Sequence, residues 1–451
     1  MKRTRTEFLS DWYTSSSRKP LIIRGARQVG KTWLVRDFAQ HQGLDLIELN
    51  FEKRPDLESL FSSNDVDEIL LNLRAFSKSE LNVSKSLLFL DEIQAAPHLL
   101  TKLRWFAEDR PDLPLVAAGS LLEFTLAKHE FSMPVGRINY MYLEPLSFEE
   151  FLSAMGESAL NRYVEKFNWN TKVPEAIHAQ LMQAVRKYML IGGMPAAISA
   201  WIETGVTHAV NQVHFDLLAT YRDDFAKYSG RLSIDRLEEV LSAVPRQLGN
   251  KFVYSKVNSQ VAAASLKQGL DLLTKARVCH SILSTAANGL PLGAEVNEKY
   301  IKVLMLDSGL CSASLGLTMH QLQLVAELTM VNNGAMAEQM VGQQLRTILP
   351  AFVSPSLYYW QRTEKGANAE IDYVLQHENQ VIPVEVKAGS TGSLKSLHQF
   401  MKEKGSTIAI RINSDYPSRC QVNIKNTSAI PIEYRLVSLP FYLIGQLHRL
   451  L

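Results

Sequence analysis

An eight-residue loop near the start of the chain constrains the fold more than any other feature of the sequence. The segment GARQVGKT, from Gly25 to Thr32, follows the apolar run 21–23 and precedes a stretch from Trp33 in which apolar residues recur with helical spacing. Two glycines separated by four residues and followed by Lys-Thr, between a strand and a helix, form the pattern of a phosphate-binding P-loop. The sequence therefore predicts a strand, a P-loop and a helix in that order, within an α/β domain.

The residues of this loop have separate expected roles. Backbone N–H groups of the loop and the N-terminus of the following helix face the phosphates of a bound nucleotide. The ammonium group of Lys31 reaches the β- and γ-phosphates, and the Thr32 hydroxyl ligates Mg²⁺. ATP and Mg²⁺ are therefore the expected cofactors, and the expected nucleotide-binding residues are Gly25, Ala26, Arg27, Gln28, Val29, Gly30, Lys31 and Thr32.

A second motif, which is acidic, is expected to act together with the P-loop. Residues 87–90 read LLFL and are followed directly by Asp91 and Glu92, which is the form of a buried parallel strand whose carboxyl end faces a ligand crevice. Asp91 is expected to hold the magnesium, directly or through water. Glu92 is expected to position and deprotonate the water that attacks the γ-phosphate.

Two further residues have alternative interpretations. Ser120 follows the apolar run 115–118, where it either senses the γ-phosphate and orients the water or caps the helix that starts after it. Arg137 precedes a fifth expected strand, at 138–143. It either stabilises transition-state charge, in its own chain or as a finger toward a neighbouring subunit, or forms a surface salt bridge.

Taken together, these motifs resemble the AAA+-type ATPases, and more narrowly a prokaryotic branch that carries a C-terminal domain of unknown function. The resemblance implies a five-stranded parallel sheet over residues 1–150 and a helical lid over 151–205. It also implies that Pro195, in the segment GGMP from Gly192, lies near the adenine ring. From the residues alone, the same segment is a helix stop.

Composition narrows the class of protein without identifying a partner. Hydrophobic residues make up 46% of the chain and charged residues 21%, as in ordinary globular proteins, and the net charge is +2. Three isolated cysteines indicate neither a disulfide framework nor a zinc cluster. No run of 18 apolar residues and no signal-peptide pattern is present, so we expect no membrane span and a cytoplasmic location.

In the middle of the chain, 206–290, apolar residues recur with the spacing of helices. The region ends with a short segment at 276–283 that is typical of a strand. Helices followed by a small β element suggest a winged-helix-like module. Such modules bind either DNA or protein. Six basic residues suit phosphate contacts: Arg246, Lys251, Lys256, Lys267, Lys275 and Arg277.

The last region, 291–451, returns to a mixed α/β pattern. A helix is expected at 335–345, followed by strands at 357–360, 369–375 and 381–387. Because side chains alternate along a strand, Glu385 and Lys387 share one face of the third strand. Asp372 and Glu385 are expected to ligate Mg²⁺ together with Glu338 from the helix, and Lys387 to stabilise charge or orient water.

An acid followed by Glu-x-Lys on an apolar strand resembles the restriction-endonuclease-like superfamily, with its PD-(D/E)xK signature. Ile371 stands where that signature has proline. The resemblance implies a nuclease-like fold that is either active or a remnant, since fold does not determine function. The alternative for these charges is a solvated strand face.

The sequence therefore predicts an ATP-hydrolysing protein with three further parts: a helical lid, a winged-helix-like module and a restriction-endonuclease-like α/β domain. In one hypothesis, nucleotide state controls a DNA-directed nuclease. In the alternative, the protein is an ATP-driven switch or scaffold whose inactive nuclease fold binds a protein or nucleic-acid partner. A phosphotransferase is less favoured, because no acceptor-binding signature is present. A homo-oligomer is compatible with either hypothesis.

Overall fold

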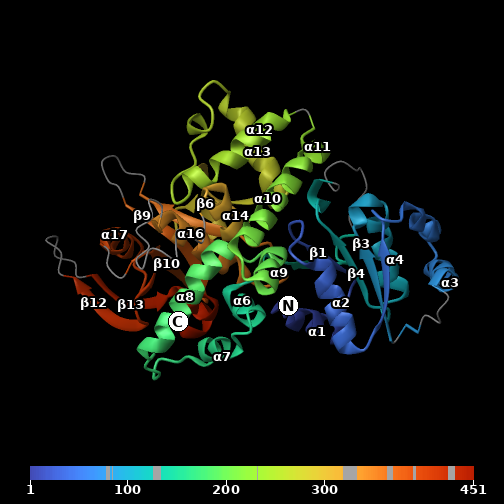
Figure 1. Ribbon diagram of the computed structural model, residues 1–451, viewed down its shortest axis with the longest axis horizontal. Helices are drawn as coiled ribbons and strands as arrows, with labels where there is room; N and C mark the ends of the chain where they lie inside the picture. The colour runs from blue at the N-terminus through green and yellow to red at the C-terminus, as the bar shows by residue number, and fades with distance from the viewer. Residues whose placement is uncertain are drawn as a thin grey trace. The chain divides into compact units, whose positions relative to one another are not determined.

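The computed structural model describes residues 1–77, 82–83, 85–124, 134–230, 232–317, 333–362, 369–389, 393–424 and 432–451 (Figure 1). The chain forms two compact units. Unit 1 comprises residues 1–144, 275–277 and 349–355, and unit 2 comprises residues 145–274, 278–348 and 356–451. Two short segments from the second half of the chain are therefore part of the N-terminal unit.

Unit 1 contains the predicted five-stranded parallel sheet, in the order β2-β3-β4-β1-β5. All residues of β3 and β4 are buried, as expected for central strands covered on both faces. The strands are β1 (Leu21–Arg24), β2 (Asp45–Asn50), β3 (Ser86–Asp91), β4 (Leu115–Gly119) and β5 (Asn139–Tyr142). Its helices are α1 (Arg5–Thr14), α2 (Lys31–Gln42), η1 (Pro55–Phe61), α3 (Val66–Ser77), η2 (Ile93–Ala95) and α4 (Leu99–Asp109).

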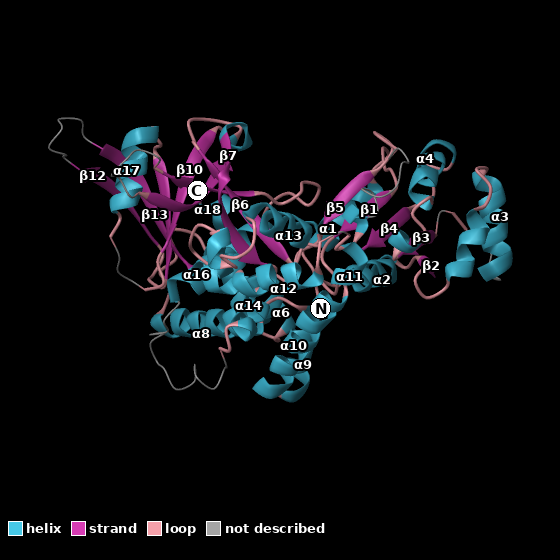
Figure 2. Ribbon diagram, turned by 90° about the horizontal axis from the view of Figure 1, so that it is seen from above, coloured by secondary structure: helices cyan, strands magenta, loops and turns pink. Residues whose placement is uncertain are grey.

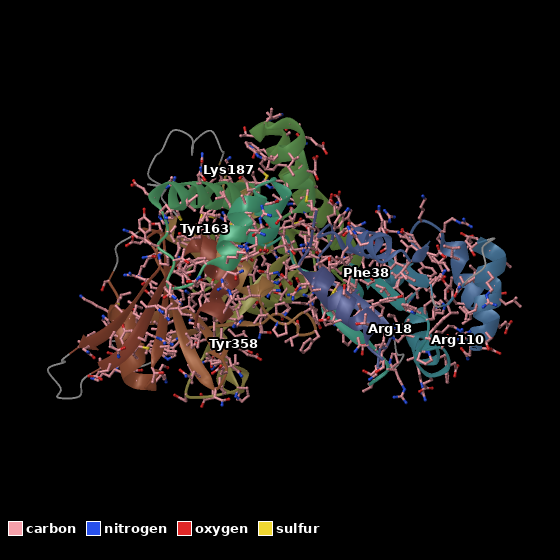
Figure 3. The ribbon with its side chains drawn as sticks, turned by 90° about the horizontal axis from the view of Figure 1, so that it is seen from below. Arg18, Phe38, Arg110, Tyr163, Lys187 and Tyr358 are labelled. Carbon is pink, nitrogen blue, oxygen red and sulfur yellow. The ribbon has the colours of Figure 1, made fainter. Side chains whose placement is uncertain are left out.

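Aromatic contacts fix the helices of unit 1. Phe38 of α2 is buried, and its ring meets the ring of Tyr13 in α1 edge to face, with centroids 5.9 Å apart (Figure 3). The core on the other side of the sheet joins α3 and α4 to β3, through residues such as Leu70, Leu100 and Leu88. These contacts hold α2, and with it the P-loop, in a rigid frame.

Unit 2 is built on an eight-stranded mixed sheet in the order β12-β13-β11-β10-β9-β8-β6-β7 (Figure 2). The pairs β6–β8, β10–β11 and β11–β13 are parallel, and the other neighbours are antiparallel. The strands are β6 (Cys279–Thr285), β7 (Val296–Met305), β8 (Leu357–Gln361), β9 (Glu370–His377), β10 (Gln380–Val386), β11 (Ile408–Asn413), β12 (Ser418–Ile424) and β13 (Ile432–Pro440). The three strands expected from 357 to 387 are confirmed as β8, β9 and β10.

The strand expected to complete a winged-helix-like module has a different place. β6 pairs with β7 and β8 inside the eight-stranded sheet, so it belongs to the same sheet as the C-terminal strands. A boundary at residue 290 therefore does not separate two compact units, and the lid region likewise falls within unit 2. The apolar pattern of 276–283 indicates a strand, but it carries no information about which partner strands that segment finds.

The helices of unit 2 surround this sheet. Helix α17 packs on β9, β10 and β13 through Leu397, Phe400 and Met401, while α16 contacts β7, β8 and β10. The helices are α6 (Phe148–Ala154), α7 (Ser158–Lys166), α8 (Glu175–Ile191), α9 (Pro195–Thr204), α10 (Thr207–Asp223), α11 (Phe225–Tyr228), α12 (Ile234–Ala243), η3 (Pro245–Gln247), η4 (Tyr254–Lys256), α13 (Ala263–Lys275), η5 (Leu292–Glu295), α14 (Ser308–Ser314), α16 (Asn333–Thr347), α17 (Lys395–Lys404), η6 (Phe441–Gln446) and α18 (Leu447–Leu450). No described helix is long and apolar enough to cross a membrane.

The Gly192-Gly193 segment ends α8 and makes a buried contact within unit 2. The N–H of Gly193 donates to Asp307 Oδ2 at 2.6 Å, and Asp307 is fully buried. A Cβ at Gly193 would lie 2.3 Å from the carbonyl oxygen of Leu146, so only glycine fits this approach. Pro195 is the first residue of α9, a position that suits proline because its missing N–H has no helical partner there. Its expected place beside an adenine ring stays a prediction.

Candidate functional site

The P-loop connects strand β1, which lies between β4 and β5, to helix α2 at the carboxyl edge of the parallel sheet. Two of its residues, Gln28 and Gly30, have positive φ angles of 64° and 96°, which lets the loop curl back on itself. A Cβ on Gly25 would lie 2.4 Å from the carbonyl oxygen of Leu143, so glycine permits the loop to pass close to the backbone after β5. The local sequence therefore forms the predicted cradle.

Lys31 points into this loop and is almost completely buried. Its ammonium group donates to the carbonyl oxygens of Gly25 at 3.1 Å and Ala26 at 2.9 Å. Burial lowers the pKa of Lys31 to about 8, although the carboxylates of Asp91 and Glu92 act in the opposite direction. A desolvated cation inside a curled loop is well suited to bind an anion such as the β- and γ-phosphates.

Thr32 and Asp91 meet as the sequence predicts. The Thr32 hydroxyl donates to Asp91 Oδ2 at 3.1 Å, and the Asn50 amide donates to the same oxygen at 3.2 Å. Burial raises the pKa of Asp91, and the neighbouring charge of Glu92 raises it further. A hydroxyl and a carboxylate that converge beside a phosphate-binding loop fit the oxygen ligands that Mg²⁺ prefers. Asn50 was not predicted, although its place at the end of β2 pairs it with Asp91 in the sheet register.

Glu92 lies where β3 ends and has a left-handed backbone, with φ of 50°. Non-glycine residues with such angles are uncommon and occur often at functional sites. The Gln94 amide donates to Glu92 Oε2 and fixes the direction of the carboxylate. A Cβ on Gly119 would lie 2.4 Å from Gln94 Oε1, so this glycine makes room for the amide that orients Glu92. The sequence analysis missed Gln94, because a glutamine in a short turn carries no pattern.

Ser120 and Arg137 lie at different ends of the same sheet. Ser120 is buried directly after β4, at the carboxyl edge, and helical backbone resumes at Leu122. Arg137 precedes β5, whose first residue pairs with the first residue of β1, so it lies at the amino edge. There it donates to Glu108 Oε1 at 2.8 Å and is half exposed. This edge is opposite the P-loop, and the expected action of Arg137 on a nucleotide in its own chain stays a prediction. A role toward a neighbouring subunit stays a prediction.

Two arginines that the sequence analysis did not place in the nucleotide site are part of unit 1. Arg3 is buried and donates to the carbonyl oxygens of Val29 at 2.8 Å and Glu144 at 2.6 Å, which ties the P-loop to the backbone after β5. Arg277 lies 3.2 Å from Glu123 and 3.8 Å from Glu144 and covers the ring of Tyr142. The prediction that Arg277 suits nucleic-acid contacts is therefore corrected, because its side chain is only 10% exposed and paired with carboxylates.

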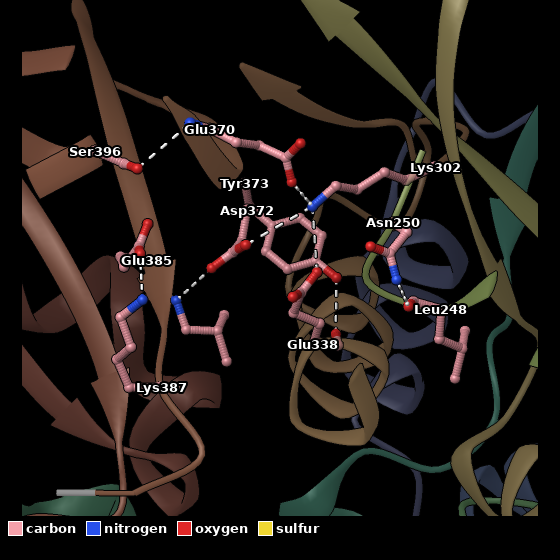
Figure 4. A network of polar contacts seen from close by, with 11 residues as sticks. Leu248, Asn250, Lys302, Glu338, Glu370, Asp372, Tyr373, Glu385, Lys387 and Ser396 are labelled. Carbon is pink, nitrogen blue, oxygen red and sulfur yellow. Dashed lines mark hydrogen bonds and ion pairs between the residues drawn. The ribbon is translucent and has the colours of Figure 1, made fainter. Parts of the chain in front are cut away.

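A second polar cluster lies in unit 2 and contains the predicted nuclease-like residues (Figure 4). At its centre is the ammonium group of Lys302 from β7, which the sequence analysis did not single out. Lys302 Nζ lies 2.5 Å from Glu370 Oε1, 3.3 Å from Glu338 Oε2 and 3.7 Å from Asp372 Oδ1. We call Lys302, Glu338, Glu370, Asp372, Glu385 and Lys387 the acidic centre.

The acidic centre places four carboxylates against two ammonium groups, those of Lys302 and Lys387. Burial by itself lowers the pKa of Lys302, but the carboxylates of Glu338, Asp372 and Glu370 together outweigh it, and the net shift is upward. Burial raises the pKa of Glu338 to about 8, with Asp372 adding to the rise. Burial and the charge of Asp372 likewise raise the pKa of Glu385 to about 7. Lys387 Nζ donates to Glu385 Oε1 at 2.5 Å.

The acidic centre contains the expected magnesium ligands together with a lysine that was not expected. The described residues contain no group of three or more acidic, histidine or cysteine side chains able to hold a metal ion. The expected ligands Glu338 and Asp372 instead share the ammonium group of Lys302, and Asp372 Oδ2 accepts the N–H of Val386 at 2.7 Å. The expected magnesium set of Glu338, Asp372 and Glu385 stays a prediction: these carboxylates lie in one cluster, and the ammonium group of Lys302 contacts two of them.

Comparison with protein families identifies three regions. Residues 17–152 match the family described as an AAA domain, residues 182–321 match a domain of unknown function (DUF8612), and residues 333–434 match another (DUF4143). The first match spans all five strands of unit 1 and agrees with its P-loop, Thr32–Asp91 contact and parallel sheet. Residues 17–152 form an AAA-type P-loop ATPase domain. Neither of the other two descriptions names an activity.

Comparison with solved structures found distant likenesses, and no curated protein matches. The Walker-type ATPase of Pyrococcus abyssi is 16% identical with a TM-score of 0.44, covering 70% of this chain and 95% of that one. The ORC2 protein of Aeropyrum pernix in its ADP form is 16% identical with a TM-score of 0.31, covering 62% and 87%. The RuvB Holliday junction branch migration motor of Thermotoga maritima is 15% identical with a TM-score of 0.28, covering 66% and 93%. At these TM-scores the likenesses carry no argument of their own.

Proposed function

We propose that the protein is an ATP-hydrolysing switch whose nucleotide state controls the binding of a macromolecular partner by unit 2. The observation that carries the proposal is the convergence of Lys31, Thr32, Asp91 and Glu92 at one edge of the parallel sheet. Thr32 and Asp91 would hold Mg²⁺, which neutralises phosphate charge when bound. Lys31 binds the β- and γ-phosphates, and Glu92, oriented by Gln94, accepts a proton from the attacking water.

The path of the chain supports communication between the nucleotide site and unit 2. Residues 275–277 of unit 1 connect α13 directly to β6, and residues 349–355 connect α16 to β8. Both segments are held firmly in unit 1. Besides the ion pairs of Arg277, the Tyr142 N–H donates to the carbonyl oxygen of Ala351 at 2.8 Å and the Arg5 guanidinium to that of Leu349 at 3.0 Å. A nucleotide-dependent shift at the end of β5 would therefore move the two segments through these hydrogen bonds and ion pairs. The segments are covalently joined to α13, β6, α16 and β8, so the shift would reach these four elements.

Binding is favoured over cutting for unit 2 because of the acidic centre. Metal-dependent phosphodiester cleavage requires carboxylates that are free to ligate a divalent cation. Here the carboxylates of Glu338, Glu370 and Asp372 are occupied by the ammonium group of Lys302. Acids that are paired with a lysine in this way support a binding module in unit 2.

ATP turnover with purified protein tests the first half of the proposal. Lys31→Ala should abolish most nucleotide binding, whereas Glu92→Gln should retain binding and reduce turnover about 10²- to 10⁴-fold. Lys85→Ala, which removes an exposed lysine of unit 1, is the matched control and should leave turnover unchanged. Undiminished turnover in the Lys31 variant would refute the assignment of the nucleotide site.

Hydrogen exchange tests the second half. In the Glu92→Gln variant, peptides from β6 and β8 should change their exchange rates between the ATP-bound and ADP-bound states. Peptides from β12, at the far edge of the sheet, provide the internal reference. Normal ATP hydrolysis with identical exchange of β6 and β8 in both states would retain the ATPase and eliminate the switch.

A further inference from the structure

The cation position of the acidic centre is taken by a side chain of the protein itself. Lys302 lies on β7, at the edge of the sheet, whereas Glu370 and Asp372 lie on β9, with β8 and β6 between them. The lysine extends across the sheet, and its ammonium group lies 5.3 Å from the centroid of the Tyr359 ring on β8. It ends between three carboxylates, as Figure 4 shows. Its side chain is only 2% exposed, so this is a built-in contact and not a surface ion pair.

The surroundings of Lys302 hold the carboxylates in this arrangement. Glu338 lies against the backbone of Gly249, where a Cβ would be 3.1 Å from Glu338 Oε1. The Tyr373 hydroxyl donates to the Glu338 carbonyl oxygen at 2.7 Å, which fixes this turn of α16 against β9. Asp372 has one oxygen toward Lys302 and the other on the Val386 N–H. The Asp372 carboxylate is therefore held on both sides, and the backbone of Glu338 is fixed against β9.

One carboxylate oxygen in the acidic centre lacks the cation that its position favours. Glu385 is 5% exposed, and its Oε2 atom is buried without a hydrogen-bond partner among the described residues. Its other oxygen accepts from Lys387. A buried unpaired carboxylate oxygen costs free energy unless a cation or donor reaches it, so the centre retains the chemistry of a cation site although Lys302 fills part of it.

We propose that Lys302 is a permanent internal replacement for a divalent cation. With Lys302 in place the acidic centre does not bind Mg²⁺ or Mn²⁺, and removal of this one ammonium group frees the three carboxylates that it contacts, Glu338, Glu370 and Asp372, to bind a divalent cation. The ammonium carries one positive charge with three donors, whereas a divalent ion needs several open oxygen ligands. The two are therefore mutually exclusive at this position.

Binding of Mn²⁺, measured by electron paramagnetic resonance without nucleotide, tests the inference. All proteins carry Asp91→Asn, which removes the carboxylate of the P-loop site from the measurement. The parent should bind no Mn²⁺ at the acidic centre. Lys302→Met should gain about one equivalent, and Lys302→Met with Asp372→Asn should lose it again. Lys302→Arg, which keeps the charge, should bind none.

Each outcome of the Mn²⁺ measurement either supports or overturns the proposal that Lys302 replaces a divalent cation. An ion bound by the parent and lost on Asp372→Asn alone would overturn the inference, because the site would then be open with Lys302 present. Folded Lys302→Met protein that binds no Mn²⁺ would also overturn it. If Lys302→Met does not fold, the decision rests on the parent and its Asp372→Asn variant, with melting curves in the presence and absence of Mn²⁺. A melting temperature that rises with Mn²⁺ only when Asp372 is present would contradict the inference, and insensitivity to Mn²⁺ would support it. None of these results depends on ATP turnover, so failure here leaves the proposed function standing.

Discussion

Replacement of Arg277 by methionine should selectively loosen the carboxyl edge of the ATPase sheet. The guanidinium lies 3.2 Å from Glu123 and 3.8 Å from Glu144, and the Glu144 side chain is only 6% exposed. Removing one partner of a buried ion pair costs about 3–5 kcal/mol, because the remaining charge loses the favourable interaction with that partner. Because Glu123 remains 20% exposed and water can solvate it, we take the lower end, about 3 kcal/mol.

Hydrogen exchange measured by mass spectrometry gives the free energy of local opening for each segment. A loss of about 3 kcal/mol corresponds to about 100-fold faster exchange of the β5 peptide, since every 1.4 kcal/mol is a factor of ten. Peptides from β2, at the opposite edge of the sheet, should change much less. The double variant Arg277→Met with Glu144→Gln should recover part of the loss, because the carboxylate that faced Arg277 is then replaced by an uncharged amide.

Two results would refute this reasoning. If the β5 peptide of Arg277→Met exchanges at nearly the wild-type rate, the ion pairs contribute little and segment 275–277 is not firmly held in unit 1. If Glu144→Gln makes the Arg277 variant worse, then the carboxylate is stabilised by other groups and the penalty does not come from the loss of its interaction with Arg277.

Further outcomes are expected from other positions. Gly193→Ala should destabilise unit 2 by about 3 kcal/mol in urea unfolding, because the new Cβ would lie 2.3 Å from a backbone oxygen. The control Gly334→Ala, with open space around the new Cβ, should leave the free energy of unfolding unchanged. Equal effects of the two substitutions would contradict the packing argument. Gln94→Ala should lower the turnover number for ATP and leave nucleotide affinity unchanged, because it removes the donor that orients Glu92; a change in affinity alone would show that Gln94 acts on binding. As the pH drops below about 6.5, the free energy of unfolding of the wild type should fall more than that of the His178→Gln variant. Burial lowers the pKa of His178 although Asp415 opposes this, so the unfolded chain binds the proton first. Identical pH profiles of stability for wild type and variant would exclude His178 as the cause.

Part of the candidate site could be predicted from the sequence because its residues are close together along the chain. The P-loop contains its own glycines, lysine and threonine within eight residues, and each acts through the backbone that the same residues form. Asp91 and Glu92 were accessible for a related reason, since a continuous apolar run that ends in acids indicates a central parallel strand. In a parallel sheet such strands end at the same edge, so the sequence places Thr32 and Asp91 at one edge, where the structure brings them into contact.

The acidic centre shows where sequence reasoning fails. The alternation in β9 and β10 correctly placed Asp372 and Glu385 in one cluster, but Lys302 lies far earlier in the chain, on an apparently ordinary strand. Its role depends on the strand order β9-β8-β6-β7, which no local period encodes. Arg137 illustrates the same limit, because an arginine before a strand has the same local sequence whichever edge of the sheet it occupies.

The sequence by itself predicted the nucleotide chemistry proposed for this protein, since the groups expected to bind phosphate and to orient water lie in two short motifs, 25–32 and 87–92. Only the tertiary structure decided which distant residues complete or neutralise those groups. Arg3 and Arg277 were brought to the ATPase sheet, and Lys302 was placed among carboxylates that would otherwise suit a metal ion. The physical reason is that a buried charge is stabilised by whatever charge lies nearest in space, and distance along the chain does not set that proximity.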